Sequence, residues 1–344
     1  MTTVSAFRAL RYDPDAAGAP LAALVAPPYD VLGEDARFAF ANRSPHNIVH
    51  LTLPESPDAA GEAIAAWLQA GVFVEEEPAL WWITQDYTGP DGVARTREGI
   101  AGSIEATPYS EGKVLPHERT HEGPKQGRLD VLRATRAQLE PIFLLYDADP
   151  PVSRPDGEPV MDVLEGADRT RVWRLPMSEL DIDTPFLIAD GHHRYETAVA
   201  FAQEEPSATH TFAVLVSSRS PGVEIFPTHR IVGGIDVDPD GFMTSTWDMS
   251  SLAMYQEGNF FRVDSEDELD TREIEKFGLH RVEYTPNAQE AVEAVEDGAA
   301  ALAFLVRAPS VEQVFEFAHR GEAMPQKTTY FYPKLVSGLL LHPV

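Results

Sequence analysis

Cysteine is absent from this chain of 344 residues, which excludes disulfide bonds, thiolate catalysis, cysteine-ligated zinc and iron–sulfur clusters. Long apolar runs are also missing: Ala299–Val306 is far shorter than the roughly 18 residues that a membrane-spanning helix needs. The opening residues, MTTVSAFRALRYD, contain no apolar core of a signal peptide. Because 43% of the residues are hydrophobic and can form a sizeable core, we expect a cytoplasmic globular protein with no membrane partner.

Lysine and positive charge are scarce. The chain has only five lysines, and 55 Asp and Glu residues outnumber 27 Lys and Arg residues, for a formal net charge of −28. Such a surface repels itself in dilute buffer, whereas molar salt shortens the Debye length to about 3 Å. We interpret the charge as adaptation to a salty cytoplasm, with a generic acidic protein as the alternative. The excess of acid also argues against duplex nucleic acid as a partner, because duplexes need a basic surface.

Alternating strand and helix patterns predict an α/β fold of the mixed α+β type. We expect one region at 1–235, with an inserted hairpin near 80–105, and a second at 236–344 whose tail (324–338) returns to the functional site. The expected strands are Val4–Tyr12, His46–Leu53, Leu80–Thr88, Val93–Glu105, Pro141–Tyr146, Pro185–Ala189, Phe212–Ser217 and Ala299–Val306. The expected helices are Glu34–Asn42, Gly61–Ala70, Arg128–Leu139, His192–Gln203, Gln289–Glu296 and Ser310–Arg320, and Ser110–Pro124 is expected to be a long loop.

The motif ADGHHRYETA (189–198) predicts a strand end, a glycine turn and a helix start. Backbone N–H groups at such a helix start bind anions, above all phosphate. Three cation-capable side chains, His192, His193 and Arg194, fall in the first helical turn, where the helix dipole disfavours cations. An anion between them would remove the repulsion, so we predict a phosphate site here. The alternative is a solvated surface turn in which Asp190 is a plain N-cap.

A second candidate site spans residues 111–142, where His117 and Glu118 form a potential acid/base pair. On the helix that follows, Arg128 and Arg136 share a stripe with leucines and are expected to face a core or a cleft. A ligand phosphate would balance their charge, and an internal arginine–carboxylate network is the alternative. The candidate anion-binding side chains of this stretch are Lys125, Arg128, Arg133 and Arg136.

Residues 117–121 also fit H-E-x-x-H, the zinc protease pattern, which works only on a helix. Here Pro116 precedes the pattern and Gly123-Pro124 follows it, so we expect no zinc. A magnesium or manganese role for Glu118 or Asp190 stays open.

The third candidate site is the tail Met324–Leu341, whose threonines and aromatic residues favour a strand. It carries Lys327 and Lys334, and four of the five lysines lie in the second and third sites. A lineage that replaces surface lysine retains it where a point charge is needed. No Walker A loop, G-x-G-x-x-G, G-x-S-x-G or kinase signature is present, so a nucleotide phosphate would have to bind at the DGHHR turn.

Five motifs, APPYDVL, PHExT, ADGHHRYETA, PTHR and KTTYFYPKL, together resemble a large prokaryotic family known only as a domain of unknown function. The resemblance extends from about Phe7 to the C-terminus. Its G-x-H-R-x-x-x-A core is similar to the phosphate-binding turn of the ParB/sulfiredoxin-like superfamily, some members of which are free-serine kinases. The resemblance implies a ParB/sulfiredoxin-like nucleotide-binding core with large additional strands and helices.

The same resemblance implies particular ligands and residues. ATP or ADP is the expected nucleotide, accompanied by Mg²⁺. The chain departs from the family pattern at Gly127, where members usually carry an acid, and at Gln326 and Thr328, where they usually have proline and serine. The phosphates would be held by Gly191, His192, His193 and Arg194, and further candidates from the other motifs are Asp30, His229 and Arg230.

We therefore expect a small-molecule phosphotransferase that resembles a free-serine kinase, with serine as a plausible acceptor. Glu118 or Asp190 would take the hydroxyl proton. One alternative is a phosphatase or other phosphoester hydrolase, in which His117 or His193 is the acid/base and water is the acceptor. Another is a non-catalytic nucleotide-binding switch. The sequence leaves the oligomeric state and the metal open.

Overall fold

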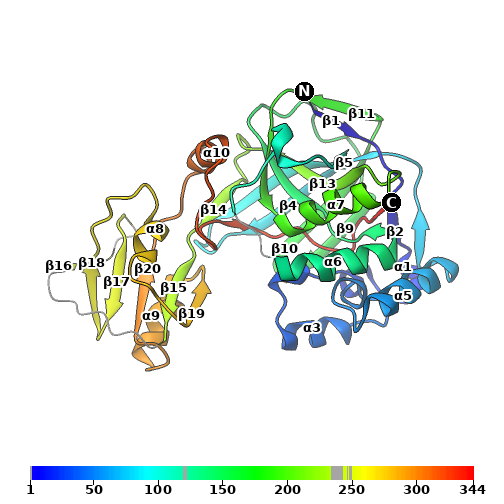
Figure 1. Cartoon of the computed structure of the whole chain (residues 1–344). Coiled ribbons are helices and arrows are strands. Elements are labelled where there is room, and N and C mark those ends of the chain that lie inside the picture. Colours follow the sequence, from blue (N-terminus) through cyan, green and yellow to red (C-terminus); the bar gives the residue numbers. More distant parts are fainter. Residues whose placement is uncertain (1, 119–121, 234–242, 246, 248–249) are drawn as a thin grey trace.

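The computed structural model describes residues 2–118, 122–233, 243–245, 247 and 250–344. Within these residues the chain forms a ten-stranded sheet and a separate six-stranded sheet. Figure 1 shows the larger sheet and its helices as one body and the smaller sheet beside it, with α10 between them. The last segment (red) runs from α10 back across the larger body, so the two ends of the sequence both contribute to it.

The large sheet has the strand order β6-β12-β8-β13-β5-β4-β10-β9, and β1 pairs with both β5 and β11. Two pairs are parallel, β6 with β12 and β8 with β13, and the others are antiparallel. This mixture confirms the mixed α/β fold. Its strands are β1 (Thr2–Ser5), β4 (Leu80–Thr88), β5 (Ala94–Glu105), β6 (Val114–Leu115), β8 (Ile142–Tyr146), β9 (Met161–Glu165), β10 (Asp168–Leu175), β11 (Glu179–Ile182), β12 (Phe186–Asp190) and β13 (His210–Ser217).

Helices and the tail cover the two faces of this sheet. Tyr195 of α7 packs in the apolar cluster on one face, and α6 packs along α7 through Leu132 and Phe201. Phe317 of α10 and Leu339 of the tail belong to the cluster on the other face. The helices are α1 (Pro14–Ala17), α2 (Leu21–Leu24), α3 (Glu34–Ala41), α4 (Val49–Thr52), α5 (Pro57–Gln69), α6 (Glu122–Thr135), α7 (His192–Glu204), α8 (Asp270–Glu275), α9 (Ala288–Glu296) and α10 (Val311–His319), with 3-10 turns η1 (Tyr29–Val31) and η2 (Tyr109–Glu111).

The small sheet has the order β16-β18-β17-β20-β15-β19, and α9 packs on it. Its strands are β15 (His229–Val232), β16 (Met243–Ser245), β17 (Ala253–Gln256), β18 (Asn259–Arg262), β19 (Val282–Thr285) and β20 (Leu302–Leu305). The sequence predicts that the second region begins at residue 236. The small sheet already includes β15, which begins at His229. Three two-stranded ribbons complete the fold: β2 (Leu10–Tyr12) with β3 (Phe73–Glu75), β14 (Glu224–Phe226) with β21 (Tyr330–Tyr332), and β7 (Ala137–Gln138) with β22 (His342–Pro343).

The hairpin predicted near residues 80–105 is confirmed as β4 and β5, but its description as an insertion is wrong. Both strands lie in the middle of the large sheet. Leu80, Trp81 and Trp82 are consecutive and all buried, so this segment packs on both faces of the sheet. A strand buried on both faces belongs to the core rather than to an added ribbon.

Four further expectations are wrong in detail. His46–Leu53 contains the helical turn α4 instead of a strand, because a short apolar run does not distinguish the two. Val4–Tyr12 is divided between β1 and β2, and the tail is a strand only at β21. The loop expected at Ser110–Pro124 includes β6, and α6 already begins at Glu122.

In the part of the chain that the structure describes, none of the helices combines the length and the apolar character needed to cross a membrane.

Candidate functional site

A cleft of about 440 Å³ opens where β12 ends, and segments far apart in the sequence line it. The second and third predicted sites and the DGHHR turn all contribute to this cleft. It is lined by Tyr29, Asp30, Val31, Glu118, Ala189, Asp190, Gly191, His192, His193, Thr228, Tyr284, Pro286, Gln326, Lys327, Thr329, Tyr330 and Lys334.

The turn at Gly191 requires glycine. Its φ is 95°, in the left-handed region, and a Cβ there would lie 3.0 Å from Nε of Arg194. Gly191 is the N-cap of α7, and it supplies no side-chain hydrogen bond to the first turn. The start of α7 therefore lacks the usual side-chain acceptor. The backbone N–H groups of its first turn point out of the helix at the end that borders the cleft.

Asp190 lies between two cations. One carboxylate oxygen accepts from the guanidinium of Arg194 and the other from the ammonium of Lys334. The Asp190 side chain is only 13% exposed. Burial alone would raise the pKa of this carboxyl, but Lys334 and Arg194 together hold the pKa well below its ordinary value. Asp190 is thus a fixed anion that anchors the tail to the turn, and a poor proton acceptor.

The charge crowding expected at the start of α7 is not present. His192 is buried, and burial together with neighbouring His117 lowers its pKa well below the ordinary value. Arg194 is paired with Asp190 and also donates to the carbonyl oxygen of Pro141. The sequence predicted three cation-capable side chains with an anion between them, whereas burial keeps His192 neutral and the ion pair with Asp190 balances the charge of Arg194. The case for an anion at this turn rests instead on the uncapped helix start.

His117 is a structural residue of the site wall rather than a lining residue. It is 1% exposed, and burial lowers its pKa to about 4. Its Nδ1 donates to the carbonyl oxygen of Ile188 at 2.7 Å, and Nε2 accepts from the hydroxyl of Thr329 at 2.9 Å. Both ring nitrogens are occupied by these contacts, so His117 joins β12 to the tail. The rest of the H-E-x-x-H pattern, residues 119–121, lies outside the described residues.

Glu118 is directed differently from its neighbour and lines the cleft. Burial raises the pKa of its carboxyl, and Lys327 opposes this effect. The backbone of Glu118 pairs in parallel with Met324, and the N–H of Met324 donates to the carbonyl oxygen of His117 at 2.8 Å. The tail therefore holds Glu118 at the cleft. A carboxylate with a raised pKa beside lysines has the properties of a general base.

Lys327 and Lys334 come to this cleft from the tail, as the lysine count suggested. Lys327 has φ of 56°, which is rare for a residue with a side chain, and it is exposed. Nζ of Lys334 lies 5.6 Å from the ring centre of Tyr330 in addition to its contact with Asp190. Backbone at Lys125 belongs to α6, but the side chain lies outside the described part of the structure.

Three predicted arginines do not join the cleft. Arg133 pairs with Asp130 and Glu204, and Arg136 pairs with Glu205, which directly follows α7. The stripe prediction is wrong for Arg136 because α6 ends at Thr135. Arg128 lies behind the cleft wall, where its guanidinium packs 3.9 Å from the ring centre of Tyr29.

The PTHR motif supports the small sheet. His229 is buried, accepts from the N–H of Val306 at 3.2 Å, and has a pKa lowered by burial to about 4. Arg230 donates to the carbonyl oxygen of Gln326 at 3.1 Å and packs 5.3 Å from the ring centre of Tyr284. These two residues brace the walls of the cleft and do not line it. Asp30 does line it and is exposed.

Sequence reasoning missed the aromatic part of the cleft. Tyr29, Tyr284 and Tyr330 line it, and Tyr284 is 46% exposed. The tyrosines of APPYDVL and KTTYFYPKL belong to motifs that the sequence had singled out, and this was an available signal. No sequence motif pointed to Tyr284, because only the folding of the small sheet brings this residue to the cleft.

Within the described residues, no group of three or more His, Asp or Glu side chains forms a metal cage. Glu118 and Asp30 still offer carboxylate oxygens at the cleft. Mg²⁺ typically binds through substrate phosphates and one or two carboxylates, so these donors fit a nucleotide-bound Mg²⁺.

The model of a family described as "Protein of unknown function (DUF1015)" matches residues 4–304. This match confirms the family resemblance of the motifs. None of the curated proteins matches the chain.

Several solved structures are similar to this chain at low identity. One is a free serine kinase in complex with AMP, with 18% identity and a TM-score of 0.42, covering 70% of this chain and 92% of that chain. A conserved hypothetical protein from Pyrococcus furiosus has 18% identity and a TM-score of 0.40, covering 70% and 95%. SbnI with a C-terminal truncation, from Staphylococcus aureus, has 11% identity and a TM-score of 0.43, covering 69% and 85%. With TM-scores below 0.5, these likenesses decide nothing about activity.

Proposed function

This chain belongs to the DUF1015 family of proteins of unknown function, and from that premise we propose that its cleft transfers a phosphoryl group from ATP or ADP to a small hydroxyl compound, with serine as the candidate acceptor. One observation carries the proposal. The uncapped start of α7, two lysines and the carboxylate of Glu118 line a single cleft. Phosphoryl transfer needs bound phosphates, positive charge around them and an acceptor for one proton.

The phosphates would lie against the start of α7, between Gly191 and the tail. N–H groups at His192 and His193 provide donors there, and the helix dipole favours the negative charge. Lys334 gives one N–H to Asp190 and retains two further donors for an anion. Lys327 also lines the cleft. In this arrangement Arg194 and Asp190 position Lys334 and the turn, and do not bind the phosphates themselves.

Glu118 suits the role of base better than Asp190 because the pKa values of the two carboxyls are shifted in opposite directions. The acceptor hydroxyl oxygen would form a bond to the terminal phosphorus while the bond from that phosphorus to the bridging oxygen breaks. The proton of the hydroxyl would go to Glu118, and the nucleotide would leave one phosphate shorter. With serine as acceptor the product is phosphoserine.

Mg²⁺ on the nucleotide would neutralise phosphate charge. Asp30, whose carboxylate lines the cleft, would hold it there, and Glu118 would remain available for the proton. The base of the nucleotide has an aromatic partner in Tyr284, whose exposed ring can stack on it.

The test follows labelled phosphate from ATP, ADP or pyrophosphate, in high-salt buffer with magnesium. The acceptor panel contains serine, related hydroxyl compounds and water. Label in serine or a related compound supports the proposal. Label released only as phosphate overturns it in favour of a hydrolase, and tight nucleotide binding without transfer overturns it in favour of a switch.

A further inference from the structure

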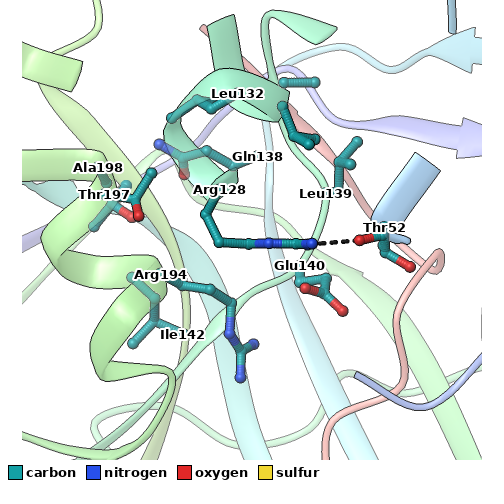
Figure 2. Close-up of a pocket in the computed structure, with 13 residues that line it drawn as sticks. Thr52, Arg128, Leu132, Gln138, Leu139, Glu140, Ile142, Arg194, Thr197 and Ala198 are labelled. Carbon is teal, nitrogen blue, oxygen red and sulfur yellow. Dashed lines mark hydrogen bonds between the residues drawn. The ribbon is translucent and has the colours of Figure 1, made fainter. Parts of the chain in front are cut away.

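A second pocket lies behind the cleft wall, between α6, α7 and the segment 137–142 (Figure 2). It has a volume of about 60 Å³. One water needs about 10–15 Å³ by this measure, so the pocket has room for roughly five non-hydrogen atoms. Most of its wall is apolar. The apolar lining residues are Val131, Leu132, Ala137, Leu139, Ile142 and Ala198.

Two polar atoms of this pocket are buried without a hydrogen-bond partner in the described structure. They are the hydroxyl oxygen of Thr52, a residue that is 0% exposed, and Nε of Arg194. Such groups cost roughly 1–3 kcal/mol each when they stay unsatisfied. Both residues line the pocket, but neither of these two atoms has surface open to it, so a ligand would reach them only after the side chain turns.

Arg128 adds a charge without a counter-ion. Figure 2 shows its side chain crossing the pocket to reach the carbonyl oxygen of Thr52, at 2.5 Å. Its other contact is the ring of Tyr29, and among the described residues it forms no ion pair. Arg194 is already paired with Asp190. The one carboxylate in the pocket, Glu140, accepts from the N–H of Tyr29 and the hydroxyl of Ser337, and burial raises its pKa.

We propose that this pocket binds a small monocarboxylate of about five or six non-hydrogen atoms. The carboxylate would lie on Arg128, and the short aliphatic chain would contact Leu132 and Leu139. A turn of the Thr52 side chain would bring its hydroxyl to the same carboxylate. The negative charge of the ligand would pair with Arg128, and its aliphatic carbons would contact the apolar wall of the pocket. This inference does not depend on the nucleotide function, because it uses a different space.

Two arginines of the pocket contact residues that line the cleft. Arg128 packs on Tyr29 of the cleft wall, and Arg194 holds Asp190 beneath the turn. A carboxylate bound between these arginines would therefore bias the shape of the cleft. By linkage, any effect of the carboxylate on nucleotide affinity equals the effect of the nucleotide on carboxylate affinity.

Potassium propionate is the probe, and propionamide is its neutral match in size. Ligand-observed NMR titrations on the full chain, at constant ionic strength, measure both affinities. We expect propionate to bind at least tenfold more tightly than propionamide, since a charge-assisted hydrogen bond is about twice as strong as a neutral one. Octanoate, which is too long for the pocket, should bind no better than propionamide.

Two variants assign the binding to this pocket. Arg128→Gln should weaken propionate at least tenfold, whereas Arg133→Gln, on the same helix but paired on the surface, should leave it unchanged. Ala198→Leu fills the pocket and should block propionate even if Arg128→Gln fails to fold. Circular dichroism checks that each variant is folded. Equal binding of propionate and propionamide, full binding by Arg128→Gln or Ala198→Leu, or no propionate signal at all would overturn the proposal.

Discussion

The carboxylate of Asp190, at the end of β12, accepts a hydrogen bond from Lys334, which lies 144 residues further along the chain. This contact fastens the tail to the DGHHR turn. The same tail holds Glu118 at the cleft through Met324. A single buried ion pair thus links the proposed phosphate site to the proposed base.

Asp190→Asn should lower the free energy of unfolding by about 3–5 kcal/mol, because it leaves Lys334 and Arg194 buried beside a neutral group. Urea unfolding in high salt measures the change. The control is Asp162→Asn, which breaks an exposed ion pair with Arg169 and should cost less than about 1 kcal/mol. Equal losses in the two variants would contradict a special role for the buried pair.

The pKa of Asp190 also predicts a pH dependence. Its folded value lies below the unfolded value of about 3.9, so the contribution of Asp190 to stability is fully present above that pH and is lost on acidification through the folded pKa. The difference in unfolding free energy between wild type and Asp190→Asn should therefore be largest near neutral pH and should shrink below about pH 4. A difference that grows on acidification would contradict the ion-pair assignment.

Glu118→Gln should bind nucleotide nearly as wild type does and should lose about 10²–10⁴-fold in transfer rate, as expected for removal of a general base. The wild-type rate should rise with pH through an apparent pKa above the ordinary glutamate value of about 4.3, because burial raises the pKa of Glu118 and only its deprotonated form accepts a proton. Glu111→Gln is the matched control, since Glu111 is exposed and pairs with Lys113. Full activity in Glu118→Gln would remove this residue from the mechanism.

Gly191→Ala should destabilise the protein by about 1–2 kcal/mol, because φ at this position is 95° and the new Cβ would press on Arg194. Nucleotide affinity should fall as well, since the start of α7 would shift. Gly127→Ala is a control with the opposite expected sign. It lies inside α6 with open space around it, so alanine should stabilise by about 0.4–1 kcal/mol. Thermal melts and nucleotide titrations measure both variants.

Melting temperature should rise steeply with potassium chloride concentration, from dilute buffer to molar salt. At 0.1 M the Debye length is about 10 Å, and the 28 excess negative charges interact over that range. At molar salt the length is about 3 Å and the repulsion is screened. A melting temperature that does not change with salt would contradict the proposed adaptation to a salty cytoplasm.

Local sequence determined the elements whose signals are local. The hairpin of β4 and β5, the turn at Gly191, the helix after it and the capping box of Ser310 and Gln313 all follow from apolar periodicity, glycine conformation or short-range hydrogen bonds. The motifs also identified Glu118, Lys327 and Lys334, which the structure places in one cleft.

Tertiary structure decided the charge state and direction of each side chain, because these depend on burial and on partners distant in sequence. His117 and Glu118 are neighbours, yet one is enclosed between Ile188 and Thr329 while the other lines the cleft. The sequence predicts Arg194 as a phosphate ligand, but in the structure its guanidinium donates to the Asp190 carboxylate and the Pro141 carbonyl oxygen. Desolvation and ion pairs between residues distant in sequence set the charge state and the direction of these side chains. A periodic pattern in one sequence contains no information about either effect.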